Sequence, residues 1–145
     1  MLLNGVPGKT FDCKIGVRQG DPLSPLLFVL AGDLPQSMIN RAKDMGLLKL
    51  PIRTTSTCDF PVVQYADDTL IILDGDARQP FFLKSLLTSF YLITGLKVNY
   101  SKSMMVPINV SEGELHNLAT TFGCSKGNLP FTYLGLPLGT ERPRA

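Results

Sequence analysis

The sequence predicts an α+β fold, in which helices pack against an antiparallel sheet of short strands. Two apolar, β-branched runs flank the stretch YADD at residues 65–68 and are spaced for a tight hairpin. Two segments, 24–45 and 79–94, repeat apolar residues every three or four positions, as helices do. Eleven prolines and thirteen glycines divide the chain into short pieces. Helices mixed with local hairpins are typical of the α+β class.

The N-terminal segment predicts two short strands and a loop. Residues 2–15 contain a Pro7-Gly8 pair, which is typical of a turn because proline fixes φ and glycine tolerates a positive φ. We expect one strand on each side of this turn. The following stretch, GVRQGDPLSP, is rich in glycine and proline and is expected to be a loop.

A long helix is predicted to begin at Ser24 and to stop at Gly46. Pro35 lies inside it and lacks the backbone N–H that an interior turn needs, at a cost of roughly 3 kcal/mol. We therefore expect a kink or a break near Asp33. The apolar face of this helix is expected to belong to the core, and it is formed by Leu26, Leu30, Leu34, Met38, Ala42 and Met45.

The middle of the chain predicts a hairpin followed by a second helix. Residues 62–65 and 69–73 are expected to be its strands, with Asp67 and Asp68 at the tip. The second helix is expected to end at Gly95 and to cover one face of the sheet. Its apolar stripe is formed by Phe82, Leu83, Leu86, Leu87, Phe90 and Ile93.

The last third predicts an extended segment, a third helix and a strand. Residues 96–108 read as extended chain. Ser111 and Glu114 form the sequence pattern of a capping box, so a helix is expected from there to Gly123. Its apolar positions are Leu115, Leu118, Ala119 and Phe122. The tail at 129–139 is expected to form one short strand leading into a turn.

Composition is consistent with one globular domain over residues 1–145. The chain is 44% hydrophobic and 18% charged, and its net charge of +2 neither requires nor forbids a polyanionic partner. The longest apolar run, LLFVLAG, is far shorter than the about 20 residues of a membrane span, and no signal peptide is recognisable. We expect an intracellular protein without a membrane span, in a compartment that the sequence does not specify.

The three cysteines do not form a metal-binding or disulfide pattern. Cys13, Cys58 and Cys124 are odd in number and far apart, without the paired spacing of a zinc site. We expect thiols in a reducing compartment.

The adjacent aspartates at 67 and 68 admit two interpretations. Aspartate is common in turns, and exposed charges interact weakly, so both side chains could simply be solvated turn residues. Alternatively, they hold a hard divalent cation, since Mg²⁺ takes oxygen ligands from one or two carboxylates together with substrate phosphates. Such a cation would cancel their repulsion, and the flanking strands would hold the oxygens in place.

Four segments in this order resemble the reverse transcriptase family. YADD between apolar strands resembles the catalytic hairpin, and GVRQGDPLSPLLF resembles the loop and helix that contact template and incoming nucleotide. GLKVNYSKS is similar to the motif that follows, and FTYLGLPLG is similar to the primer grip. The residues of these motifs are similar to those of polymerases of plant-type non-LTR retrotransposons, and the match covers nearly the whole chain. The resemblance implies a partial polymerase palm, with an antiparallel sheet whose YADD hairpin packs against helices.

The resemblance assigns roles to particular residues. Asp67 matches the invariant metal-binding aspartate and Asp68 the weaker second ligand, both catalytic. Lys102 matches a position thought to protonate the leaving pyrophosphate in some polymerases, although it could equally be an exposed loop lysine. The residues matched to nucleotide, template or primer terminus are Arg18, Gln19, Gly20 and Tyr65, and those matched to the primer grip are Tyr133, Leu134 and Gly135.

The reaction that this resemblance implies is two-metal phosphoryl transfer. A primer 3′-hydroxyl attacks the α-phosphate of a deoxynucleoside triphosphate, with two Mg²⁺ or Mn²⁺ ions about 3.5–4 Å apart in the complete enzyme. The implied partners are an RNA template, a DNA primer and deoxynucleoside triphosphates. Base pairing selects the nucleotide, so the protein contacts mainly the backbone and the minor groove.

The sequence also departs from the family pattern. Fifteen residues precede Gly16, and Asp12, the one acid among them, has neither the flanks nor the distance of the family's first metal-binding aspartate. We expect that aspartate, the fingers, the thumb, the endonuclease and the long C-terminal region to lie outside these 145 residues. Loss of one metal-binding carboxylate costs several kcal/mol of transition-state stabilisation, so the isolated chain is expected not to polymerise.

Three classes of function are compatible with these observations. The chain is a fragment of a polymerase whose upstream part is an expected partner, or a non-catalytic nucleic-acid-binding palm remnant, or an α+β domain without biochemical activity. Apolar faces that contact other domains in a complete polymerase would be exposed, so we also expect low solubility or self-association.

Overall fold

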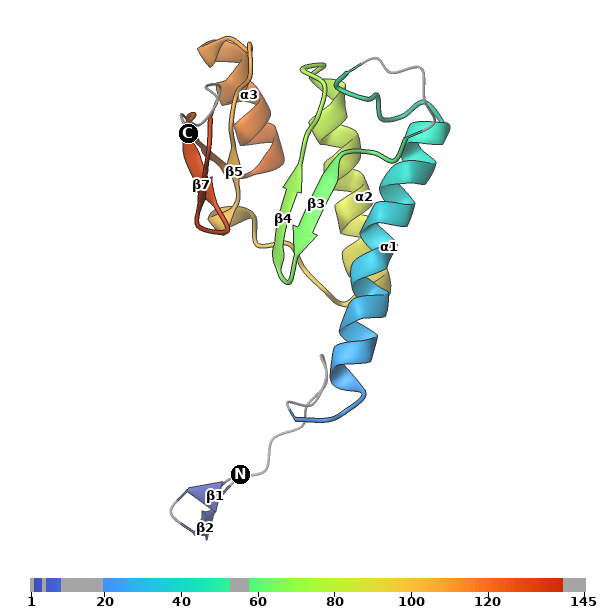
Figure 1. Cartoon of the computed structure of the whole chain (residues 1–145), viewed down its shortest axis with the longest axis vertical. Helices are drawn as coiled ribbons and strands as arrows, with labels where there is room; N and C mark the ends of the chain where they lie inside the picture. The colour runs from blue at the N-terminus through green and yellow to red at the C-terminus, as the bar shows by residue number, and fades with distance from the viewer. Residues whose placement is uncertain (1, 4, 9–19, 53–57, 140–145) are drawn as a thin grey trace.

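A computed structural model describes residues 2–3, 5–8, 20–52 and 58–139, and it confirms the mixture of helices with small, mostly antiparallel sheets (Figure 1). Arg18 and Gln19 lie outside the described residues. Along the described chain, the elements are β1 (Leu2–Leu3), β2 (Val6–Pro7), α1 (Ser24–Asp44), β3 (Val62–Tyr65), β4 (Asp68–Ile71), α2 (Arg78–Thr94), the 3₁₀ helix η1 (Tyr100–Lys102), β5 (Met104–Met105), α3 (Glu112–Phe122), β6 (Ser125–Lys126), β7 (Phe131–Tyr133) and β8 (Leu136–Leu138).

The strands of the described chain form four separate pairs, where the sequence predicted one antiparallel sheet. β1 pairs with β2, β3 with β4 and β7 with β8, all antiparallel, whereas β5 and β6 are parallel. A parallel pair needs a crossover, which α3 supplies between β5 and β6. Helices or loops, rather than the hydrogen bonds of a continuous sheet, therefore connect one described pair to the next.

The helix α1 is continuous from Ser24 to Asp44, so the expectation of a break near Asp33 is wrong. Pro25 lies in its first turn and Gly46, with φ +73°, follows its end, as predicted. Pro35 is inside the helix. The C-terminal half of α1 buries Ile39 and Ala42 in the core, and this packing offsets the lost hydrogen bond.

The core lies between α1, α2, α3 and the segments that precede the β3–β4 hairpin. Its fully buried side chains include Phe60 and Leu48, which come from the connection between α1 and β3. The core cluster consists of Ile39, Ala42, Leu48, Phe60, Leu83, Leu87 and Phe122, with Val62 and Ile71 of the hairpin packed against it. The hairpin therefore rests on the helical layer, as Figure 1 shows.

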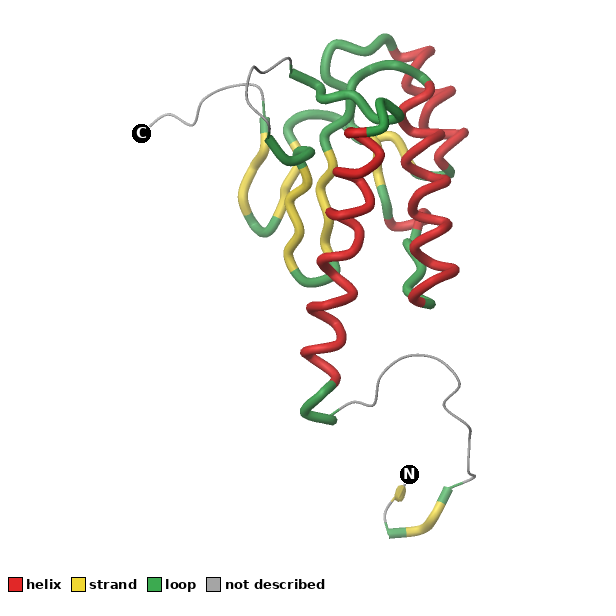
Figure 2. The backbone as a smooth tube through the Cα atoms, turned by 90° about the vertical axis from the view of Figure 1, so that its right-hand side faces the viewer, coloured by secondary structure: helices red, strands yellow, loops and turns green. Residues whose placement is uncertain are grey.

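The expectation that the whole apolar face of α1 is core is wrong for its first half and for Met45, which follows the last residue of the helix and is 66% exposed. Leu26 and Leu30 are 61% and 68% exposed. Figure 2 shows the reason, since the start of α1 extends past the body of the domain, where no other described helix lies beside it. In α2 the predicted stripe is buried at Leu83, Leu87 and Phe90.

Helix ends agree with the sequence predictions. Gly95 ends α2 and Gly123 ends α3, both in the left-handed conformation that glycine permits. At the start of α3, the Ser111 and Glu114 side chains each bond the other's backbone N–H, so the capping box is confirmed. Ile93, which was expected on the buried face of α2, is 70% exposed because it lies in the last turn.

Three smaller expectations need correction. β2 contains Pro7, so the N-terminal turn does not lie at Pro7-Gly8, and Gly5, with φ +82°, lies between the two strands. The segment 96–108 includes η1 and is not wholly extended. The tail forms two strands rather than one.

None of the helices in the described ranges is long and apolar enough to cross a membrane.

Candidate functional site

The two aspartates lie where β3 turns into β4. Tyr65 pairs with Asp68 at the end of the ladder, which leaves Ala66 and Asp67 as the two-residue turn. Ala66 has φ +51°, a left-handed conformation that costs an L-residue roughly 1–2 kcal/mol. Non-glycine residues in this conformation cluster at functional sites, where surrounding structure holds them in place.

Both carboxylates are open to solvent and to a cation. Asp67 and Asp68 are exposed, and in the described part of the chain neither carboxylate accepts a hydrogen bond or forms an ion pair. Two neighbouring, unpaired carboxylates are a donor set that suits Mg²⁺ or Mn²⁺. However, the described residues contain no group of three or more metal-binding side chains. The hairpin tip therefore offers two ligands and needs others to complete a metal's shell.

The hairpin is attached to α1 through Phe60, two residues before β3. The Phe60 backbone N–H donates to Asn40 Oδ1 at 2.8 Å, and its carbonyl accepts from Gln36 Nε2 at 3.2 Å. Asn40 Nδ2 also donates to Asp59 Oδ1 at 2.9 Å. With the Phe60 ring fully buried, these bonds fix the entry of β3 on the helix.

A second attachment joins the middle of β3 to α1. A Cβ at Gly32 would lie 3.3 Å from Gln64 Nε2, closer than an ordinary contact. Glycine at this position lets the hairpin approach the helix. The sequence carried a signal for this contact, because an isolated glycine inside a helical pattern usually has a packing reason.

The C-terminal hairpin contacts the aspartate hairpin. The Tyr133 hydroxyl, at the end of β7, donates to the Val63 carbonyl of β3 at 3.3 Å. The turn of this second hairpin consists of Leu134 and Gly135, with φ +51° and +80°. Two segments 70 residues apart in the sequence are thus joined, and each turn holds a non-glycine residue with positive φ.

The other predicted site residues are less closely gathered. Lys102 is exposed at the end of η1 and, like both aspartates, has no ion-pair partner among the described residues. Gly20, with φ +83°, begins the segment that leads into α1. In Figure 1 this blue segment lies beyond the tip of the β3–β4 hairpin. Tyr65 is 65% exposed beside the turn.

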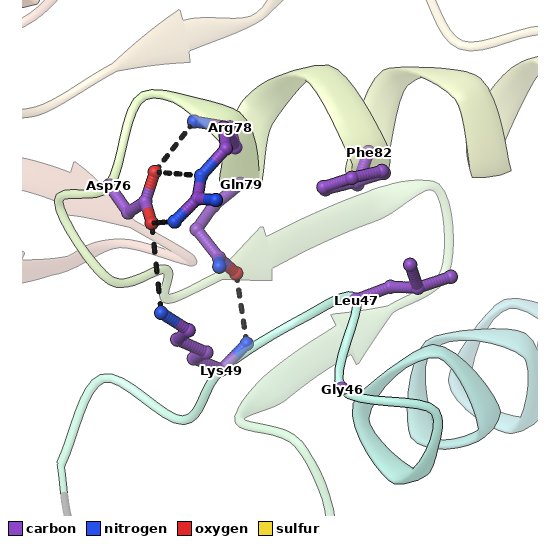
Figure 3. A pocket seen from close by; sticks show the side chains of 7 residues that line it. All are labelled: Gly46, Leu47, Lys49, Asp76, Arg78, Gln79 and Phe82. Atoms are coloured by element: carbon purple, nitrogen blue, oxygen red, sulfur yellow. Dashed lines mark hydrogen bonds and ion pairs between the residues drawn. The ribbon is translucent and has the colours of Figure 1, made fainter.

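A pocket at the N-terminal end of α2 holds a cluster of charged and polar side chains that the sequence did not reveal (Figure 3). The Asp76 carboxylate bonds Arg78 Nη2 at 2.7 Å and lies 3.8 Å from Lys49 Nζ. Gln79, 2% exposed, accepts from the Lys49 backbone N–H at 2.9 Å. The Arg78 side chain, then its backbone N–H, hold the pKa of Asp76 well below its ordinary value of 3.8.

Acidification is expected to remove the contribution of Asp76 to stability. Because its pKa is lower in the folded than in the unfolded chain, this contribution is present above about pH 4 and is lost as the pH falls further. In thermal unfolding, the difference in midpoint between the wild-type chain and Asp76→Asn should shrink below pH 4 and in high salt. Arg78→Gln should give the same pattern, and a difference that grows with acidification would contradict the assignment.

Comparisons with known proteins give a consistent result. A family model described as "Reverse transcriptase (RNA-dependent DNA polymerase)" matches residues 2–138. A retrovirus-related Pol polyprotein from the type-1 retrotransposable element R2 of Popillia japonica is 32% identical over 98 residues, which cover 68% of this chain and 13% of that protein. An uncharacterized mitochondrial protein of Arabidopsis thaliana is 34% identical over 106 residues, 70% of this chain and 83% of that protein. The chain thus spans a small part of the polyprotein. No solved structure matches.

Proposed function

The chain belongs to the reverse transcriptase (RNA-dependent DNA polymerase) family, and we propose that residues 1–145 form a single partial palm domain of such a polymerase. In a complete enzyme it would add deoxynucleotides to a DNA primer on an RNA template by two-metal phosphoryl transfer. The similarity to an R2 polyprotein and to an Arabidopsis protein supports our further proposal of a plant-type non-LTR retrotransposon as the source.

The contact between Tyr133 and Val63 is the observation that supports this proposal most directly. It joins the hairpin proposed as the primer grip to the hairpin that bears Asp67 and Asp68. A polymerase must hold the primer terminus beside the metal-binding carboxylates, because the reacting oxygen and phosphate must approach to about 3–3.5 Å. A domain in which these two hairpins were apart would not support this function.

We assign the following roles to side chains around the two hairpins. Asp67 and Asp68 would hold Mg²⁺ or Mn²⁺, which would stabilise the charge that develops on the transferring phosphoryl group. Tyr65 would pack near the primer terminus, and Lys102 would donate a proton to the leaving pyrophosphate. The primer grip would be formed by Tyr133, Leu134 and Gly135, and the template and nucleotide contacts by Arg18, Gln19 and Gly20.

We propose that this chain does not polymerise by itself. The described residues contain two unpaired carboxylates at the hairpin tip and no third metal ligand beside them. A further carboxylate would have to come from another segment, for which the upstream part of a polymerase is the expected source. The alternative that this same observation favours is a non-catalytic palm remnant that binds nucleic acid.

Binding to a primed RNA template tests both forms of the proposal. Affinity should fall with increasing salt, because phosphate contacts release counterions. If Lys102 contacts a phosphate, Lys102→Gln should reduce the slope of log K against log salt by about 1. Fluorescence anisotropy between 50 and roughly 200 mM salt measures this slope.

The matched control is Lys126→Gln. Lys126 is also exposed, but it pairs with Glu112 at 3.6 Å on another part of the surface. This variant should bind like the wild-type chain. Affinity that does not change with salt would leave only a domain without nucleic-acid function, and an equal effect of both variants would remove Lys102 from the proposed site.

A further inference from the structure

Basic residues are concentrated in one part of the chain, although its net charge is only +2. Residues 77–111 contain no aspartate or glutamate, and their basic residues are Arg78, Lys84, Lys97 and Lys102. Arg78 and Lys84 already have partners, in an ion pair and in a hydrogen bond to a backbone carbonyl. Lys97 and Lys102 are exposed, and neither takes part in the ion pairs of the described chain.

These two lysines lie at the ends of a short segment that forms a hollow on the surface. The hollow is lined by Lys97, Val98, Asn99 and Tyr100 and has a volume of about 420 Å³. Figure 1 shows the chain turning back there, from the end of α2 towards β5. Lys102 follows the hollow at the end of η1. We call the surface of residues 97–102 the basic hollow.

Contacts with two helices hold the basic hollow in place. Lys97 Nζ lies 5.9 Å from the centroid of the Tyr91 ring, and Lys84 Nζ lies 5.5 Å from the centroid of the Tyr100 ring. Lys84 and Tyr91 are two turns apart on one face of α2, so the segment returns along this face. The Tyr100 ring also packs edge-on against Phe122 of α3, at 5.4 Å between centroids. The lysines therefore extend from a backbone that is packed on α2 and α3.

The side chains of the basic hollow suit a polyanion. Asn99 Oδ1 accepts from the Ser101 hydroxyl at 2.7 Å, which leaves Asn99 Nδ2 as a donor without a partner among the described residues. Lysine ammonium groups and amide donors bind phosphate oxygens. Tyr91 adds a ring that is 38% exposed, and cations beside exposed aromatic rings are typical of proteins that bind single strands. The segment has no acidic side chain to repel such a ligand.

We propose that the basic hollow binds the phosphate backbone of a single-stranded nucleic acid. Lys97 and Lys102 would each contact a phosphate, and Asn99 would donate to one of them. Tyr91 would hold Lys97 in position through its ring. The inference rests on the proposed function for the class of ligand, but it uses neither the aspartates nor the primer-grip hairpin, and Lys102 is the one residue that both share.

Binding of an unprimed, single-stranded RNA to the full chain tests this inference. Lys97→Gln should weaken binding about fivefold at roughly 0.1 M salt and reduce the slope of log K against log salt by about 0.7, the contribution of one phosphate contact on a single strand. Lys97→Arg should restore both. The matched control is Arg41→Gln, which removes an exposed cation of α1 that has no ion pair in the described chain and should have no effect.

A second pair of variants tests how Lys97 is held. Tyr91→Phe retains the ring under the ammonium group and should bind RNA like the wild-type chain. Tyr91→Leu removes the ring and should weaken binding, by no more than Lys97→Gln does. Both variants should keep the wild-type midpoint of thermal unfolding to within a few degrees, because Tyr91 is partly exposed. Equal binding by Tyr91→Leu and the wild-type chain would overturn the role of the ring.

The outcomes separate this inference from the proposed function. If Lys97→Gln binds RNA like the wild-type chain while Lys102→Gln weakens binding to a primed template, the basic hollow is overturned and the proposed function stands. If Lys97→Gln weakens RNA binding while Asp67→Asn leaves Mn²⁺ binding unchanged, the basic hollow stands without the metal site. An equal effect of Arg41→Gln would overturn the inference, as would binding of a polyglutamate peptide in place of RNA. Weaker binding that appears only with a lower unfolding midpoint in Lys97→Gln would also overturn it, since Lys97 would then merely stabilise the end of α2.

Discussion

Phe60→Ala is expected to lower the free energy of unfolding by about 3–5 kcal/mol. The Phe60 side chain is only 1% exposed and belongs to the core cluster. Removing the ring loses its transfer free energy and leaves a cavity that the surrounding helices fill only partly. Since small domains are stable by about 5–15 kcal/mol in total, this loss is a large fraction of the total stability. Urea unfolding followed by circular dichroism measures the loss.

The control for this prediction is Phe81→Ala. It removes the same ring from a residue that is 58% exposed on α2, so the loss of stability should be much smaller. The core variant should also loosen the β3–β4 hairpin, because the buried Phe60 ring helps to hold the entry of β3 on α1, although its backbone bonds to Asn40 and Gln36 are retained. Equal losses in the two variants would show that Phe60 does not anchor the core.

Local signals in the sequence predicted the helix ends well. A glycine after an apolar stripe, as at Gly95 and Gly123, permits the left-handed conformation that ends a helix. The capping box at Ser111 and Glu114 is also complete within four residues. These features depend on neighbours in the chain, so a single sequence contains the information that they need.

Burial could not be predicted in the same way. Leu30 and Ile39 belong to the same helix and are both apolar, yet Leu30 is 68% exposed and Ile39 is fully buried. Periodicity identifies an apolar face but does not say how far along that face a neighbouring element reaches. The end of α2 determines this limit, and it is a property of tertiary packing. Pro35 similarly looked like a break because packing was not known.

The candidate site was predictable in part. Asp67 and Asp68 were visible because adjacent acids between apolar strands are unusual, and the resemblance supplied their roles. The bond from Tyr133 to Val63 joins residues 70 positions apart, so no local pattern could reveal it. The second strand of the tail was missed because the turn uses Leu134 at φ +51°, where glycine, asparagine or aspartate is usual.

The largest functional effect is expected from Asp67→Asn on the binding of Mn²⁺. In the wild-type chain, paramagnetic broadening of backbone amide signals should be centred on residues 64–69, where the two unpaired carboxylates lie. The substitution keeps the size of the side chain and removes one of the two adjacent negative charges. The apparent dissociation constant of Mn²⁺ at the hairpin should therefore rise at least about tenfold, which corresponds to about 1.4 kcal/mol.

Asp44→Asn is the matched control, because it removes an exposed carboxylate at the end of α1, in the helix turn before Gly46. It should leave broadening at the hairpin unchanged, and uniform broadening in all three proteins would contradict a site at Asp67. Neither the wild-type chain nor Asp67→Asn should extend a primer on RNA with deoxynucleotides and Mg²⁺ or Mn²⁺. Extension by the wild-type chain that Asp67→Asn abolishes would show that two carboxylates suffice here, and that a third is not required.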